Sequence, residues 1–169
     1  LYLSLTLIPN IGFAITNYLN FIYTILLFST IILPLISVFF LIKYKIVSSL
    51  EMTIYKERPA PLFIAAIWMG LGYYKLEGIL FFSPLLKAEL LGAIIILFLA
   101  AVISNYWKIS LHMLGIGGAV GLLFSLNILF GGLLKIIILF ILLSGILGVA
   151  RLSQKAHNHK QIYAGFLAG

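Results

Sequence analysis

The chain has 169 residues, of which 63% are hydrophobic and only 9% are charged, and it contains no cysteine. This composition cannot supply the charged surface that a soluble domain of the same length needs, so it excludes a water-soluble enzyme and predicts an integral membrane protein. The missing cysteines exclude disulfides and thiolate metal sites. The net charge of +7 suits anionic lipid headgroups, and no basic and aromatic strip of the kind that binds nucleic acid is present.

Apolar runs separated by short polar links predict an all-α, polytopic transmembrane helix bundle with about six to seven spans. In chain order the runs cover roughly residues 1–17, 21–42, 60–74, 88–106, 111–128 and 133–150, and the start of a seventh follows residue 161. Pro34 predicts a kink in the second run. We expect residues 1–169 to form a single transmembrane domain that is truncated at one or both ends, because Leu1 is not an initiating Met and the last run is too short to cross a bilayer.

Small residues recur four positions apart, in the pairs Gly117/Gly121, Ser144/Gly148 and Gly165/Gly169. Such pairs allow helices to approach closely in lipid. The run Gly115-x-Gly117-Gly118 could also be interpreted as a phosphate-binding loop. It lies inside an apolar run and lacks the Lys-Ser/Thr ending of such loops, so we expect helix packing here.

Polar residues are expected to gather at one face of the membrane. If the spans run up and down, the links before the third and fifth runs and after the sixth return to the same side. That face would hold seven polar residues, which include all three histidines of the chain: Arg58, Lys108, Ser110, His112, Arg151, His157 and His159. Arginine and histidine with few carboxylates suit an oxyanion such as phosphate, and ionisable groups at membrane depth are usually functional. The alternative, ordinary interfacial basic residues, is the better interpretation of most lysines: Lys43, Lys45, Lys56, Lys155 and Lys160.

Three short motifs follow one another along the chain: Arg58-Pro59, then Ser110-Leu111-His112, then Arg151-x5-His157. In this order they resemble the signature of the type-2 phosphatidic-acid phosphatase superfamily, in a divergent bacterial branch. That signature reads Lys-x6-Arg-Pro, Pro-Ser-Gly-His and Ser-Arg-x5-His-x3-Asp. The resemblance covers residues 58–169, and it includes the tail Ile162-Tyr163-Ala164-Gly165.

The resemblance implies a phosphatase that acts on the phosphate headgroup of a membrane lipid, without a metal or other cofactor. His157 would attack the phosphorus and form a phosphohistidine, and His112 would protonate the leaving group. Basic and hydroxyl side chains would hold the phosphate oxygens, namely Arg58, Arg151, Ser110, Lys56 and Lys108. Gln161 lies four residues after His157, so on a helix the two share a face, and the amide could accept a hydrogen bond from the ring.

The chain departs from this signature at several positions. Glu51 stands where the family has Lys, so Lys56 would have to supply the positive charge. Gln161 stands where the family has the Asp that orients the nucleophile, and an amide lacks the negative charge that stabilises an imidazolium. Smaller departures occur at Ile109, Leu111 and Ala150. His159 is a second candidate nucleophile by proximity alone.

Two functions therefore stay open. One is the lipid phosphatase. The other is a catalytically inactive relative that binds a lipid phosphate or scaffolds a complex with other membrane proteins. A transporter or channel would need polar residues at mid-membrane in several spans, and the only candidates are Asn10, Ser125 and Asn127.

Two signals disagree about the side of the membrane on which this face lies. Eight Lys and Arg residues fall on the face with the motifs (43, 45, 56, 58, 108, 151, 155 and 160) and three on the other (75, 87 and 135). The positive-inside rule would place the motifs in the cytoplasm. The resemblance points to the outer side of a bacterial inner membrane. We expect the periplasmic side, because a face that binds phosphate needs basic residues for binding, so its positive charge does not report the membrane topology.

Overall fold

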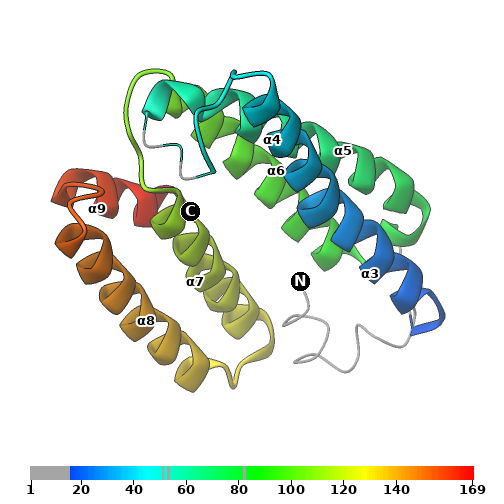
Figure 1. Cartoon of the computed structure of the whole chain (residues 1–169). Helices are drawn as coiled ribbons and strands as arrows, with labels where there is room; N and C mark the ends of the chain where they lie inside the picture. The colour runs from blue at the N-terminus through cyan, green and yellow to red at the C-terminus, as the bar shows by residue number, and fades with distance from the viewer. Residues whose placement is uncertain (1–15, 51, 53, 82) are drawn as a thin grey trace. The chain divides into compact units, whose positions relative to one another are not determined.

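The computed structural model describes residues 16–50, 52, 54–81 and 83–169, and every regular element in these ranges is helical (Figure 1). The prediction of an all-α fold is confirmed for this part of the chain. The chain divides into two compact units, one within residues 1–106 and the other comprising residues 107–169.

The described residues of the first unit form three long helical rods. The first rod begins at the 3-10 turn η1 (Thr16–Tyr18) and continues without interruption through α3 (Leu19–Leu27), η2 (Phe28–Ile32) and α4 (Leu33–Lys43). After a loop and the 3-10 turn η3 (Tyr55–Glu57), the chain forms α5 (Pro59–Leu80) and then α6 (Pro84–Ser104). Both α5 and α6 start with a proline, which suits a first helical residue because its N–H would have no partner in the helix.

The expected effect of Pro34 takes a specific form. The segment η2, immediately before Leu33 and Pro34, is π-helical rather than α-helical. Proline lacks an N–H, and its ring crowds the carbonyl four residues earlier, so a wider turn at that point accommodates it. The irregularity that the sequence predicts is therefore a π-helical turn inside a continuous rod.

The core of the first unit joins α3 to the end of α5 and the start of α6. It consists of apolar side chains with at most 4% exposure: Ile22, Leu76, Leu80, Leu86 and Leu90. The rod and α5 also approach closely, since a Cβ on Gly72 would lie 2.5 Å from Oγ of Ser29. Between α4 and α5, Nε1 of Trp68 donates a hydrogen bond to Oγ of Ser37 at 2.9 Å.

The second unit is an antiparallel pair of long helices with a short helix beside it. The long helices are α7 (Leu111–Phe130) and α8 (Leu134–Ser153), and α9 (His159–Ala168) follows (Figure 1). The turn between α7 and α8 contains Gly131 and Gly132, both with positive φ (72° and 78°), a conformation that other residues rarely adopt. Oδ1 of Asn127 accepts a hydrogen bond from N of Leu133 at 2.9 Å and closes this turn.

Glycines allow α9 to lie directly on α7. A Cβ on Gly117 would collide with the backbone carbonyl oxygen of Phe166, and one on Gly165 would lie 2.7 Å from the carbonyl oxygen of Ser110. Gly169 is held equally closely against the backbone of Leu114. The prediction that the small residues serve helix packing is therefore confirmed for these glycines. The alternative of a phosphate-binding loop is wrong, because the run from residue 115 to 118 lies inside α7.

Four helices among the described residues are long and apolar enough to cross a membrane: the rod Leu19–Lys43, α6, α7 and α8. These helices indicate an integral membrane protein. Helix α5 has sufficient length but is less apolar and carries Lys75 and Glu77 near its end, and α9 has only 10 residues. The predicted run over residues 1–17 falls almost entirely outside the described residues, so the expected six to seven spans are not confirmed.

Candidate functional site

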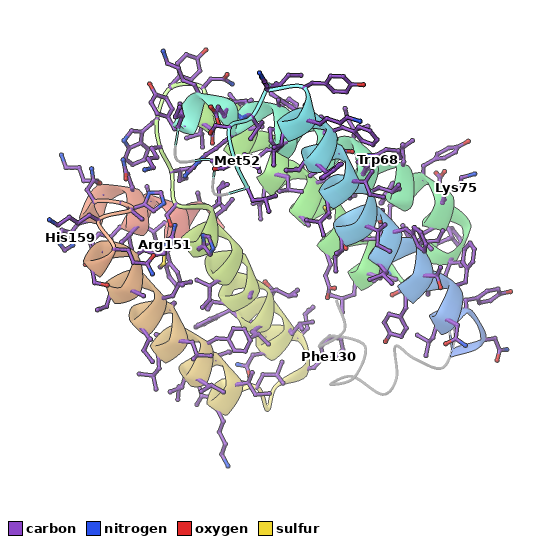
Figure 2. All side chains as sticks on the ribbon, viewed as in Figure 1. Met52, Trp68, Lys75, Phe130, Arg151 and His159 are labelled. Atoms are coloured by element: carbon purple, nitrogen blue, oxygen red, sulfur yellow. The ribbon has the colours of Figure 1, made fainter. Side chains whose placement is uncertain are left out.

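Three helix ends of the second unit meet at the same end of the α7–α8 pair. Helix α7 begins after Ser110, α8 ends two residues after Arg151, and α9 begins at His159 (Figures 1 and 2). The backbone N–H of Ser110 donates to the carbonyl oxygen of Gln161 at 3.4 Å, which ties the start of α7 to the first turn of α9. The folding argument from the sequence is thus correct within this unit: the second and third motifs lie together.

Ser110 is the N-cap of α7 and is completely buried. Its Oγ accepts a hydrogen bond from the backbone N of Met113 at 3.5 Å. This contact gives the serine an ordinary structural role, since a serine at this position satisfies an N–H that has no partner in the helix. The hydroxyl hydrogen is still available as a donor in this arrangement, because capping uses only an oxygen lone pair.

His157 and Gln161 are in contact, as the four-residue spacing predicts. His157 lies just before α9, is 7% exposed, and has its Nδ1 3.1 Å from Oε1 of Gln161. The same Oε1 accepts a hydrogen bond from the backbone N of Asn158 at 3.1 Å. In return, Oδ1 of Asn158 accepts one from the backbone N of Gln161 at 3.0 Å.

Asn158 and Gln161 therefore form a capping box at the start of α9. The sequence interpretation missed Asn158, although the pattern Asn158-x-x-Gln161 is a readable signal for the start of a helix. The box also gives Gln161 a structural reason to be where the family signature has Asp. A carboxylate and an amide can both cap a helix in this way, but only the carboxylate brings a negative charge.

Arg151 lies in the last turn of α8, at the end of the unit where α7 begins (Figure 2). One of its terminal nitrogens donates to Oε1 of Gln154 at 3.2 Å. Its Nε is buried and makes no hydrogen bond with any described residue. A cation here interacts favourably with the carboxyl end of the helix, but a buried guanidinium N–H that the protein does not satisfy is the kind of donor that an anionic ligand would use.

The second unit is strongly basic. Residues 107–169 contain no Asp or Glu, but they contain five Lys and Arg residues and three His: Lys108, Lys135, Arg151, Lys155, Lys160, His112, His157 and His159. All four carboxylates of the chain belong to residues before 107. Of these basic groups Lys135 lies at the far end, near the start of α8, and His112 is exposed in the first turn of α7. No carboxylate within this unit can therefore neutralise Arg151.

The first motif belongs to the first unit. Arg58 precedes α5 and is 6% exposed, and its Nε donates to the carbonyl oxygen of Met52 at 3.0 Å. Its neighbour Glu57 accepts hydrogen bonds from both N and Oγ of Ser48, at 2.9 and 2.8 Å, which closes the loop that follows α4. Lys56 is exposed, and Glu51 lies outside the described residues.

No group of three or more His, Cys, Asp or Glu side chains that could hold a metal ion occurs among the residues that the structure describes. Comparison of the chain with family models, with curated proteins and with solved structures finds no match. The function is therefore inferred from the chemistry and geometry of the residues around His157.

Proposed function

We propose that this protein is a membrane-embedded lipid phosphatase, in which the end of the second unit binds a phosphate headgroup and His157 attacks its phosphorus. The observation that carries the proposal is the buried His157 ring, held at Nδ1 by Gln161 in a unit that contains no carboxylate. The family resemblance of the three motifs supports the same chemistry. A basic site without carboxylates attracts a phosphate. Its positive side chains then stabilise the negative charge on the phosphate oxygens, as phosphoryl transfer requires.

The reaction takes place in two displacements. A nitrogen lone pair of His157 forms a bond to phosphorus while the bond between phosphorus and the lipid oxygen breaks, and His112 supplies the proton that the leaving oxygen takes up. Water then attacks the phosphorus of the phosphohistidine and gives up a proton to His112, the N–P bond breaks, and inorganic phosphate leaves. Within the second unit, the phosphate oxygens are held by Arg151, Ser110 and Lys108.

The whole chain is proposed to be a multi-pass protein of a bacterial inner membrane, with its site on the periplasmic side. The apolar run over residues 1–17 and helix α5 would add crossings to the four apolar helices, giving about six spans. The substrate is then a lipid whose phosphate headgroup is presented at the membrane surface.

The second candidate is a catalytically inactive relative that binds a lipid phosphate or scaffolds a membrane-protein complex. One observation favours it: the residue at the orienting position is a neutral amide that already serves a capping box. In the serine-protease triad, changing the orienting Asp to Asn lowers kcat by about 10⁴. A comparable loss here would leave binding without useful turnover.

The deciding experiment measures phosphate release by the detergent-purified protein from a panel of lipid monophosphates and diphosphates. His157→Ala is compared with His159→Ala, because His159 is a histidine two residues away whose side chain is exposed. A phosphatase loses at least about 10³-fold in rate in the first variant and keeps most of it in the second. Equal release by wild type and His157→Ala would refute the nucleophile. No release from any lipid, with binding of the lipid phosphate retained, would establish the inactive relative.

A further inference from the structure

The rod of the first unit ends in an ordered turn. The backbone N of Lys45 donates to the carbonyl oxygen of Ile42 at 2.9 Å. The backbone N of Ile46 donates to the carbonyl oxygen of Leu41, also at 2.9 Å. Together these two hydrogen bonds form a Schellman motif, which gives the chain a defined path out of α4. Lys45 occupies the left-handed position of the motif, with φ of 59°, although glycine is the residue that adopts this conformation most easily.

Two further features fix the path of the residues that follow. The side chain of Val47 is buried, at 1% exposure. The backbone N and Oγ of Ser48 both donate to Oε2 of Glu57, at 2.9 and 2.8 Å, which ties the turn to the residues just before α5. Residues 44–48 are therefore held at both ends, by the helix cap on one side and by a carboxylate on the other.

The same turn presents large apolar side chains to its surroundings. Tyr44, Ile46 and Leu50 are 70%, 56% and 69% exposed, on either side of the buried Val47. Because the path of the turn is fixed, these side chains cannot escape water by a local collapse, and another apolar phase must cover them. The turn follows directly on a rod of 25 residues that is long and apolar enough to cross a membrane. The bilayer surface is therefore the apolar phase that the turn meets.

Positive charge accompanies these apolar side chains. Lys43 and Lys45 are exposed, and residues 43–50 contain no Asp or Glu. Across the whole loop, residues 43–58, four Lys and Arg outnumber two Glu, and Glu57 is turned toward Ser48. Lysine ammonium groups beside apolar side chains match the layers of a bilayer surface, where phosphate groups lie above the acyl chains. A lysine at such a surface is attracted further by lipids with a net negative charge.

We propose that residues 43–50 form an interfacial anchor, whose apolar side chains enter the boundary of the acyl layer and whose two lysines bind the phosphates of anionic phospholipids. Ile46 and Leu50 supply the apolar contact. Tyr44 lies at the level of the headgroups, where an aromatic ring with a polar tip is favoured. The anchor belongs to the first unit and does not depend on the chemistry at His157.

The depth of the turn can be measured with spin labels on single cysteines, because the full chain has no native cysteine. The labelled protein is reconstituted in vesicles of phosphatidylcholine, with or without phosphatidylglycerol. Collisions with oxygen, which is enriched among the acyl chains, and with a water-soluble nickel chelate then report the depth of each label by EPR. We expect the labels of Ile46→Cys and Leu50→Cys to lie about 5–10 Å below the bilayer surface. Gln154→Cys, at an exposed glutamine after α8, is the control and should lie in water.

The double variant Lys43→Gln/Lys45→Gly separates the charge from the shape of the turn. Glycine adopts the left-handed conformation at position 45 more easily than lysine, so the thermal midpoint should be unchanged or raised. The variant should nevertheless lose the additional depth that phosphatidylglycerol gives to the label at position 46. That additional depth should also disappear in 1 M salt, where the Debye length falls to about 3 Å, whereas the depth in phosphatidylcholine alone should remain.

Three outcomes would contradict the anchor. Labels at positions 46 and 50 that meet the nickel chelate as often as the control label would place the turn in water. Labels that neither reagent reaches would show that protein, and not lipid, covers the turn. A depth that is the same in both lipid mixtures and in the double variant would overturn the binding of anionic phospholipid by the two lysines.

Discussion

At the scale of single residues, each polar side chain near His157 has both a structural and a chemical explanation. Ser110 caps α7, Gln161 caps α9, and Arg151 lies at the carboxyl end of α8. Helix capping satisfies backbone groups that would otherwise be costly in an apolar surrounding. What capping does not explain is the buried Nε of Arg151, which no described residue satisfies. This guanidinium is therefore the residue through which anion binding is best examined.

Arg151→Gln should weaken the binding of a short-chain phosphatidic acid by about 10- to 100-fold, since a charge-assisted hydrogen bond contributes about 1.5–3 kcal/mol. Lys160→Gln removes the same charge from an exposed side chain of α9 and should change the Kd by less than about threefold. Calorimetric titration in one detergent and at one salt concentration measures both. Equal losses in the two variants would mean that only net charge matters and that Arg151 makes no specific contact.

At the scale of helices, backbone proximity between α7 and α9 organises the second unit. Gly117 and Gly165 occupy the points where the two helices are closest, and Gly148 of α8 packs against Ile162 and Met113. Because His157 and Gln161 are carried by the start of α9, this contact also determines where they lie relative to Ser110. Helix packing and site geometry are thus the same feature in this unit.

Gly117→Ala should destabilise the protein by about 1–3 kcal/mol, because the added Cβ would meet a backbone carbonyl that cannot move without shifting α9. Gly115→Ala is the matched control on the same helix, since a Cβ there meets nothing within 4 Å. It should be neutral or slightly stabilising, because alanine is the better helix former by about 1 kcal/mol. Thermal unfolding followed by tryptophan fluorescence compares the two. A lower midpoint for Gly115→Ala than for Gly117→Ala would contradict the close contact.

At the scale of the whole molecule, the apolar helices place the protein in a membrane. Helix α8 has 20 residues, which at 1.5 Å per residue spans about 30 Å, the thickness of the hydrocarbon layer. Its two ends carry different groups, Lys135 at the start and Arg151 at the end. The periplasmic location of the Arg151 end is a proposal that the membrane topology can test directly.

The chain lacks native cysteine, so single cysteines report the topology without further changes. Gln154→Cys and Lys135→Cys lie at opposite ends of α8, and both positions are exposed. A membrane-impermeant maleimide added to intact bacterial spheroplasts should label the first variant, and it should label the second only after the membrane is opened. Labelling of both from outside would show that α8 does not cross. The reverse pattern would place the site in the cytoplasm.

The sequence by itself determined the class of this protein and the approximate positions of its long helices. Apolar runs of about 20 residues leave the chain little choice in lipid, because every backbone polar group must be satisfied within its own segment. The predicted run 111–128 agrees with α7 (Leu111–Phe130) to within two residues. The predicted run 60–74 was too short, since α5 continues through Lys75 and Glu77 to Leu80. A charged residue does not by itself end a helix.

The details of the site depended on tertiary structure. Spacing predicted that Gln161 would face His157, but only the folded start of α9 shows that Asn158 orients the amide and that Ser110 lies against the same turn. Likewise, the pairs of small residues predicted close packing without identifying the partners, which are α7 and α9. The physical reason is the distance along the chain between the residues that interact. Helix formation in lipid is decided by neighbouring residues, whereas hydrogen bonds and backbone contacts between helix ends join residues about fifty positions apart in the chain, as Ser110 and Gln161 are.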